Sequence, residues 1–235
     1  NERPCDYYYV TPGHQVPTGV TMSSARRRQL LEHATRHDAV IIEDDYDSES
    51  NFTLNPLPAL KASDRSGRVV YVSSLSKALS PGLRLGFMVA DPDLIDEARA
   101  LRRLVYRHPP TNIQYQMAHF LAQGHYETHL RRYHYDSAQR WECLHAALQR
   151  YLPSCRALAG SEHANAFWLQ TPAQINTQQL TWRAAHAGVL IEPGARHFLN
   201  AAPPDNYFRM GFHAINPDAI AQGVEVLRGQ LEQMG

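Results

Sequence analysis

The stretch Ala39–Glu43 reads A-V-I-I-E, a continuous apolar run that ends in an acid. This pattern is typical of a strand that is covered on both faces, as in a parallel sheet flanked by helices. Ala25–His37 precedes it, with apolar residues at helical spacing and a serine, Ser23 or Ser24, placed to cap the first turn. Before that helix, Tyr7–Thr11 is short, aromatic and β-branched. The order strand, helix, strand predicts a βαβ unit.

The rest of the chain changes character after Asp91. Before it, the sequence predicts two further strands, at Arg68–Val72 and Leu83–Ala90. A loop with a short turn, Pro56–Ala62, is predicted between the second and third strands of the chain. After it come three predicted helices, Asp93–Tyr106, Asn112–Gln123 and Glu127–Tyr151. The last part mixes strands at Phe167–Gln170, Val189–Glu192 and Tyr207–Phe212 with helices at Thr177–Ala187 and Asn216–Met234. An α/β domain followed by a smaller α+β domain is therefore expected.

Composition excludes several classes of protein. Lys+Arg and Asp+Glu both number 23 in 235 residues, so the chain lacks the basic excess of a free-standing nucleic-acid binder. It has no apolar run long enough for a transmembrane helix and does not begin with the pattern of a signal peptide. Three scattered cysteines without C-x-x-C predict neither a disulfide framework nor a metal site. The sequence thus favours a cytoplasmic protein without a metal.

A candidate reactive lysine follows the predicted strand that ends at Val72. Lys77 closes the run S-S-L-S-K, and P-G-L-R follows with Arg84 seven residues on. A lysine at the mouth of a buried strand can lose its proton and attack an aldehyde. Ser74 and Arg84 are placed to hold a phosphate. A solvated lysine and an arginine paired with a surface acid would be the bland alternative, but the joint pattern favours a functional site.

Acidic residues follow the strand Ala39–Glu43, in the segment E-D-D-Y-D-S-E at 43–49. Ligands of open α/β sheets bind beyond the carboxyl ends of the strands. Clustered acids there are costly unless they meet a cation, for which a pyridinium nitrogen beside Asp44 would serve. Tyr46 could donate to a ring phenolate oxygen. A solvated acidic turn is the alternative, and no EF-hand spacing supports a calcium loop.

Two more places carry candidate ligand contacts. In T-P-G-H-Q-V-P-T-G, turn residues bracket His14 and Gln15, which a rigid loop could present to a ligand, although a plain surface loop is nearly as good an interpretation. Arg209 lies inside the apolar run Y-F-R-M-G-F. A buried arginine needs an anion, which a ligand carboxylate or an internal salt bridge, for example with Glu192, would supply.

Taken together, these motifs resemble those of the pyridoxal phosphate (PLP) enzymes of aminotransferase fold type I, class I/II. The shared motifs, in the family's order, are P-T-G at 17–19, E-D-D-Y at 43–46, S-L-S-K at 74–77, P-G-L-R at 81–84 and F-R-M-G-F at 208–212. The resemblance implies part of a large domain with a mostly parallel sheet (1–125), a long connecting helix (126–152) and a small C-terminal α+β domain (153–235). It also implies PLP as the cofactor.

By the same resemblance, Lys77 would form a Schiff base with PLP and Asp44 would pair with the pyridine nitrogen. Tyr46 would contact the phenolate oxygen, and Ser74 and Arg84 would hold the phosphate. His14 or Gln15 would stand where aminotransferases usually carry an asparagine. Arg209 would take the carboxylate of the bound ligand.

Within that family, V-T-P-G-H-Q-V-P-T-G and I-I-E-D-D-Y-D-S-E resemble the MocR/GabR-type regulators of the GntR family. These regulators join a winged helix to an aminotransferase-like domain that senses a ligand. The resemblance implies a C-terminal piece of a longer cytoplasmic protein, a homodimer, with an amine or amino-acid effector, DNA contact only through the absent winged helix, and no membrane contact. A working aminotransferase is the main alternative, and a folded interaction module without cofactor is a third.

Overall fold

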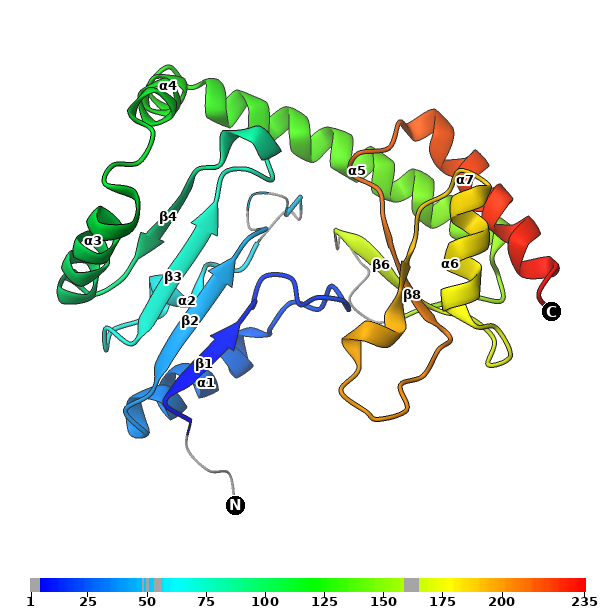
Figure 1. The fold of residues 1–235 in the computed structure, drawn as a ribbon, viewed down its shortest axis with the longest axis horizontal. Helices are drawn as coiled ribbons and strands as arrows, with labels where there is room; N and C mark the ends of the chain where they lie inside the picture. Colours follow the sequence, from blue (N-terminus) through cyan, green and yellow to red (C-terminus); the bar gives the residue numbers. More distant parts are fainter. Residues whose placement is uncertain (1–4, 48, 50, 53–55, 159–164) are drawn as a thin grey trace. The chain divides into compact units, whose positions relative to one another are not determined.

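The computed structural model describes residues 5–47, 49, 51–52, 56–158 and 165–235 (Figure 1). The chain divides into two compact units. Unit 1 comprises Asn1–Gln15 and Thr21–Tyr133, and unit 2 comprises Val16–Val20 and His134–Gly235. The limits of the three predicted segments, 1–125, 126–152 and 153–235, stay a prediction.

A four-stranded sheet forms the centre of unit 1 (Figure 1). Its strands, in spatial order, are β1 (Tyr7–Val10), β2 (Val40–Asp45), β3 (Val69–Ser74) and β4 (Gly86–Val89). The first three run parallel, and β4 pairs antiparallel with β3. The prediction of a mostly parallel sheet with helices is confirmed. The strand expected from Leu83 is wrong at its start, because Pro81–Leu83 form a 3-10 turn and pairing begins only at Gly86.

The expected cover on both faces of the sheet is wrong, because Tyr7 and Tyr9 of β1 are 66% exposed. Unit 1 also contains helices. They are α1 (Ser24–Arg36), the single turn α2 (Leu60–Ser63), α3 (Pro92–Tyr106), α4 (Thr111–Ala122) and the start of α5 (His125–Tyr151), which continues into unit 2. Ser23 caps α1 by accepting a hydrogen bond from the backbone N–H of Arg26. In the predicted loop Pro56–Ala62, the turn is the beginning of α2, which extends to Ser63.

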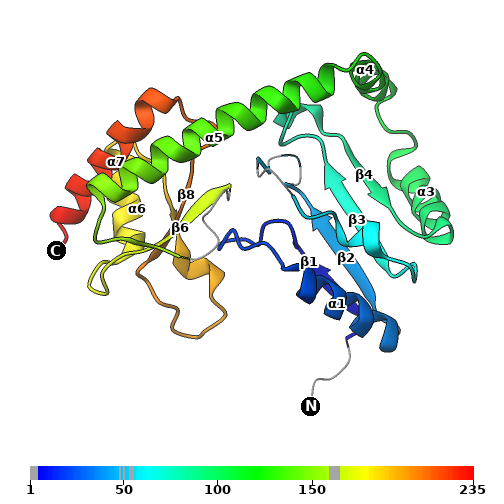
Figure 2. The ribbon, with the colours of Figure 1, turned by 180° about the vertical axis from the view of Figure 1, so that it is seen from behind.

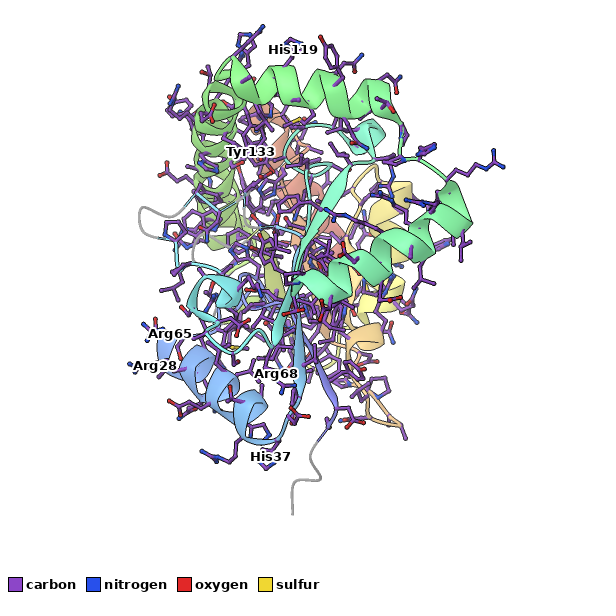
Figure 3. All side chains as sticks on the ribbon, turned by 90° about the vertical axis from the view of Figure 1, so that its left-hand side faces the viewer. Arg28, His37, Arg65, Arg68, His119 and Tyr133 are labelled. Atoms are coloured by element: carbon purple, nitrogen blue, oxygen red, sulfur yellow. The ribbon has the colours of Figure 1, made fainter. Side chains whose placement is uncertain are left out.

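The core of unit 1 lies between α1, α2 and the sheet. It consists of five buried side chains, Ala34, Ala39, Ile41, Leu60 and Val69. Figure 2 shows α1 in front of β1 when the molecule is viewed from behind. Figure 3 labels Arg28 on α1, with Arg65 and Arg68 from the segment between α2 and β3. Burial of this apolar face holds the three parallel strands in register, and therefore sets where their carboxyl ends lie.

Unit 2 contains a second, antiparallel sheet. Its strands, in spatial order, are β5 (Arg156–Ala157), β6 (Ala166–Gln170), β8 (Tyr207–Gly211) and β7 (Glu192–Pro193). Besides the rest of α5, unit 2 contains the helices α6 (Thr177–His186) and α7 (Pro217–Glu232), and Gly194–His197 form a 3-10 turn. The strand expected at Val189–Glu192 is wrong in extent, because only Glu192 and Pro193 pair with β8. The other two predicted strands and both predicted helices of this unit lie within two residues of their expected limits, whereas β5 was not predicted.

A glycine permits the tight packing beside β7. Gly194 is buried, and a Cβ atom added there would lie 2.5 Å from the ring of Trp168 and 2.6 Å from the backbone oxygen of Tyr207. No other residue type fits without moving β6 or β8. The turn after β7 is therefore fixed against the sheet, close to the strand position that carries Arg209.

Candidate functional site

The acidic segment and the lysine segment leave the sheet of unit 1 at the same edge. In the parallel register, Asp44 pairs with Val72 and Asp45 with Ser73. Both β2 and β3 end there, so the chain continues into 46–49 on one side and into S-L-S-K on the other. This is the carboxyl edge of parallel strands, where ligands of α/β proteins bind.

The acids of this segment differ in role. Glu43 is fully buried, and its two carboxylate oxygens accept hydrogen bonds from the backbone N–H groups of Leu60 (2.7 Å) and Lys61 (2.9 Å). These are the first amides of α2, whose N-cap residue Ala59 offers no side-chain acceptor. Burial raises the pKa of Glu43 despite these hydrogen bonds. Glu43 is therefore a helix cap rather than a ligand contact.

Asp44 points to the opposite face of β2 from Glu43, as side chains of successive strand residues do. Its Oδ2 accepts a hydrogen bond from the hydroxyl of Tyr9 on β1. That hydrogen bond, with burial and the charge of Asp44, raises the pKa of Tyr9. The carboxylate is only partly buried, so it stays accessible on this face of the sheet.

Asp45 and Tyr46 hold the segment against its neighbours. Asp45 accepts a hydrogen bond from the hydroxyl of Tyr71 (2.8 Å), and its backbone oxygen accepts one from Ser73 Oγ (2.9 Å). The hydroxyl of Tyr46 donates to the backbone oxygen of His14 (3.2 Å). Tyr46 is thus anchored to the loop after β1. Contacting a ring oxygen instead would require its hydroxyl to leave this carbonyl.

Lys77 forms an ion pair with Asp47, an acid that the sequence interpretation left without a role. The Asp47 side chain is only 2% exposed, whereas that of Lys77 is 36% exposed. The Nζ atom also lies 4.8 Å from the centre of the Tyr46 ring. On the other side of Asp47, His14 Nδ1 is 3.7 Å from Oδ2. Burial lowers the pKa of His14, partly opposed by the charge of Asp47.

The segment after Lys77 folds back to β3. Ser74 Oγ accepts a hydrogen bond from the backbone N–H of Ser76 (3.2 Å), and the N–H of Leu75 donates to the backbone oxygen of Leu85 (3.0 Å). Arg84 follows the turn with a left-handed backbone (φ 49°), a sparsely populated conformation that often marks functional sites. Its side chain is exposed. Ser74 and Arg84 are thus carried by one hydrogen-bonded hairpin.

The loop with His14 and Gln15 is anchored by a buried arginine. Arg27 of α1 donates to three backbone oxygens, those of Pro12 (2.8 Å), Met22 (2.9 Å) and Pro58 (2.7 Å). Burial lowers the pKa of Arg27. Gln15 is exposed and accepts a hydrogen bond from Thr11 Oγ1 (2.8 Å). The structure therefore aims His14, not Gln15, at the cluster around Asp47.

Arg209 lies on β8 in unit 2, opposite Glu192 of β7. The structure realises the internal salt bridge that the sequence left open, with 3.3 Å between Arg209 Nη1 and Glu192 Oε2. The side chain is half-buried, at 26% exposed, rather than fully buried as expected. Glu192 Oε1 also contacts His197 (3.3 Å) and Arg196 (3.6 Å).

The sequence therefore located most of the cluster in unit 1. Lys77, Tyr46 and His14 meet around Asp47, and Asp44 lies on the adjoining strand end. Tyr9 and Asp47 were missed, and only the alternation of side chains along the strand at 7–10 could have indicated Tyr9. Within the described residues, no group of three or more His, Cys, Asp or Glu side chains is arranged to hold a metal ion. None of the helices in that part of the chain is long and apolar enough to cross a bilayer.

Fold and site together define a class of protein. The mostly parallel sheet with a lysine after β3, followed by a small α+β unit, is the architecture of fold type I aminotransferases. The family model "Aminotransferase class I and II" matches residues 10–192, and the chain belongs to that family. The resemblance inferred from the motifs is confirmed.

Individual relatives of the chain include transcriptional regulators and aminotransferases. The chain is 39% identical to the HTH-type transcriptional regulator TauR of Rhodobacter capsulatus over 92% of its length, and 34% identical to the probable rhizopine catabolism regulatory protein MocR of Rhizobium meliloti over 94%. It spans 44% of each of those proteins. Among solved structures, LysN, an α-aminoadipate aminotransferase of Thermus thermophilus complexed with N-(5'-phosphopyridoxyl)-L-leucine, matches with a TM-score of 0.87 at 27% identity, covering 97% of this chain and 59% of that one.

Proposed function

We propose that this chain is the cofactor- and effector-binding part of a PLP-dependent transcriptional regulator, with Lys77 as the residue that bonds to the cofactor. The similarity to TauR and MocR over more than nine-tenths of the chain carries this proposal. Because the chain spans less than half of each regulator, DNA contact is assigned to a domain outside it. The equal numbers of acidic and basic residues agree with that division.

The residues of unit 1 fit the chemical parts of PLP. Asp44 is a partly buried carboxylate at the carboxyl edge of the sheet, suited to a protonated ring nitrogen. Tyr46 offers a hydroxyl to the ring oxygen, and His14 lies beside it. Ser74 and Arg84, on their shared hairpin, provide a hydroxyl and a guanidinium for the phosphate. Gln15, which is exposed, is kept as a weaker candidate contact.

When bound, the cofactor supplies an aldehyde carbon that bonds reversibly to amines. Lys77, with more than a third of its side chain exposed, can reach such a carbon and can be displaced from it by an amine ligand. Arg209 would hold a carboxylate of that ligand. An amino acid or a similar amine with a carboxylate is therefore the proposed effector class. Binding would shift the regulator between two states with different affinity for DNA.

Two further properties complete the proposal. We propose a homodimer, because proteins of this family have their sites near a dimer interface. We also propose a cytoplasmic location, where a regulator meets DNA. Sedimentation of the purified chain would test the first property, since a monomer at micromolar concentration would contradict it.

The first experiment is an absorbance titration of the chain with PLP, followed by borohydride reduction and peptide mass spectrometry. The chain has only two lysines, Lys61 and Lys77. The proposal expects a visible band in the native chain and in Lys61→Ala, loss of the band in Lys77→Ala, and a reduced cofactor adduct on Lys77 alone. An adduct on Lys61, or equal bands in both variants, would contradict the role of Lys77.

A working aminotransferase is the second candidate, and the similarity to LysN favours it. The two candidates differ in turnover. If amino acids convert the loaded chain and a keto acid restores it through many cycles, the enzyme is supported. If an amine changes the spectrum and the DNA affinity of the longer protein without such cycles, the regulator is supported.

A further inference from the structure

Asp47 is a deeply buried acid at the candidate site, and unlike Glu43 it contacts the lysine. Its side chain is 2% exposed, and its two oxygens face different partners, Lys77 at Oδ1 and His14 at Oδ2. A buried carboxylate without a cation is strongly disfavoured, so the carboxylate needs at least one charged neighbour. The three residues come from three motifs that are far apart in the sequence.

The two neighbours are not equivalent. Burial lowers the pKa of His14, and the positive charge of Lys77 acts in the same direction. Both effects favour the neutral imidazole at pH 7, at a distance of 3.7 Å that is too long for a hydrogen bond. The charge that compensates Asp47 is therefore the ammonium of Lys77. The face of Tyr46, 4.8 Å from Nζ, further favours the charged form of the lysine.

We propose that Asp47 is the positioning residue of Lys77, whose ammonium it holds beyond the carboxyl end of β3 whenever the lysine is not bonded to the cofactor. The ion pair itself stands on the geometry. Its consequence rests on the proposed function. An amine ligand that takes the place of Lys77 enters as an ammonium and must lose a proton, and Nζ leaves as an amine that can take up a proton. Asp47 stabilises the lysine in that protonated form and so favours the exchange.

The chain offers an internal control for a direct test. Lys61, the other lysine, pairs with a different aspartate, Asp64, at 3.1 Å. The full chain, freed of cofactor, is treated with formaldehyde and cyanoborohydride between about pH 6 and 10. The neutral amine adds to formaldehyde with loss of water, and cyanoborohydride supplies the hydride that gives the methylated lysine. Mass spectrometry of peptides follows each lysine separately.

Only the neutral amine reacts with formaldehyde. Each unit by which the pKa of the lysine falls therefore makes the reaction near pH 7 tenfold faster. Loss of an adjacent opposite charge shifts such a group by about one to three units. We expect Asp47→Asn to speed methylation of Lys77 tenfold or more and to leave Lys61 unchanged, and Asp47→Glu to stay near the native rate. A Lys77 rate within twofold of native in a folded Asp47→Asn chain would overturn the proposal.

A second measurement uses the native chain and does not require the Asp47→Asn chain to fold. In the native chain labelled with [15N]lysine, the Nζ signals of the two lysines are distinguished with Lys61→Arg. We expect the Lys77 ammonium to persist to about pH 10 or above, as an ion-paired lysine does. Titration of Lys77 below about pH 9 would contradict the proposal. Neither measurement uses PLP, so failure to bind the cofactor would overturn the proposed function and leave this test intact.

Discussion

Arg209 Nη1 lies 3.3 Å from Glu192 Oε2, across the pair of strands β7 and β8. The arginine proposed to hold a ligand carboxylate therefore already contacts a carboxylate of its own chain. The other oxygen of Glu192 faces His197 and Arg196, so Glu192 would keep partners if a ligand took its place on Arg209. A ligand must compete with Glu192 for the same guanidinium.

Glu192→Gln is expected to strengthen the binding of carboxylate ligands, because the amide removes a competing negative charge from Arg209. For a half-exposed ion pair the gain should be roughly threefold to tenfold in affinity. The PLP-loaded chain can be titrated by absorbance with alanine and with ethylamine, which lacks the carboxylate. Only alanine should respond to the substitution. Weaker alanine binding in the variant would instead mean that Glu192 orients Arg209.

Glu43→Gln and Asp44→Asn are expected to separate stability from cofactor binding. The amide introduced by Glu43→Gln can accept only one of the two hydrogen bonds that Glu43 accepts from the first turn of α2. We therefore expect the free energy of unfolding to fall by about 1–3 kcal/mol.

The amide introduced by Asp44→Asn cannot neutralise a ring nitrogen, but its site is partly exposed. That variant should unfold near the native midpoint and bind PLP at least tenfold more weakly, an order-of-magnitude expectation for a lost charge partner.

Urea denaturation and PLP titration of both variants check this pair of outcomes. If Asp44→Asn destabilised the chain as much as Glu43→Gln while cofactor affinity stayed native, the assignment of the two acids would be reversed.

The sequence could separate neither these acids nor their partners. Glu43, Asp44 and Asp47 are alike in composition and lie within five residues of one another. The pleat of β2 puts Glu43 and Asp44 on opposite faces, but a continuous apolar run does not show which face each acid takes. Asp47 lies beyond the strand, so its burial depends on the loop around His14, which Arg27 holds from α1. Such contacts between distant segments leave no local pattern.

Strand location was easier to predict than strand pairing. Strands β2 and β3 were found because each contains an apolar run, and β1 because it is short, aromatic and β-branched. Apolar runs do not specify direction, however, so the antiparallel pairing of β4 with β3 was not foreseen. The apolar residues before Glu192 predicted a strand, yet only Glu192 and Pro193 pair. The close packing of Gly194 against Trp168 fixes that position, and this is a tertiary contact.

Gly86→Ala is expected to disturb the lysine segment from the neighbouring strand. A Cβ atom at Gly86 would lie 2.8 Å from the backbone oxygen of Ser73, so the end of β3 would have to move. We expect a loss of about 1–3 kcal/mol in the free energy of unfolding and weaker PLP binding. Gly82→Ala is the matched control, because its Cβ would meet only Ser80 Oγ, at 3.8 Å. Equal effects of the two substitutions, by urea denaturation, would contradict this explanation.

Glu49 is expected to make the stability of the chain depend on pH near neutrality. Burial, aided by the charge of Asp45, raises the pKa of Glu49 from 4.5 to about 7. The folded chain thus binds this proton more tightly than the unfolded chain. The resulting stabilisation is complete below about pH 4.5, decreases as the pH rises, and is lost above about pH 7. Because the group is only half-buried, we expect a decrease of about 1–2 kcal/mol.

Glu49→Gln removes this titration, so its unfolding free energy should change less between pH 5 and pH 8 than that of the native chain, by about 1–2 kcal/mol. Urea denaturation at the two pH values measures the difference. Glu97→Gln, which changes an exposed glutamate of α3, should retain the native dependence. If Glu49→Gln lost stability as steeply as the native chain over this range, another group would be responsible for the titration.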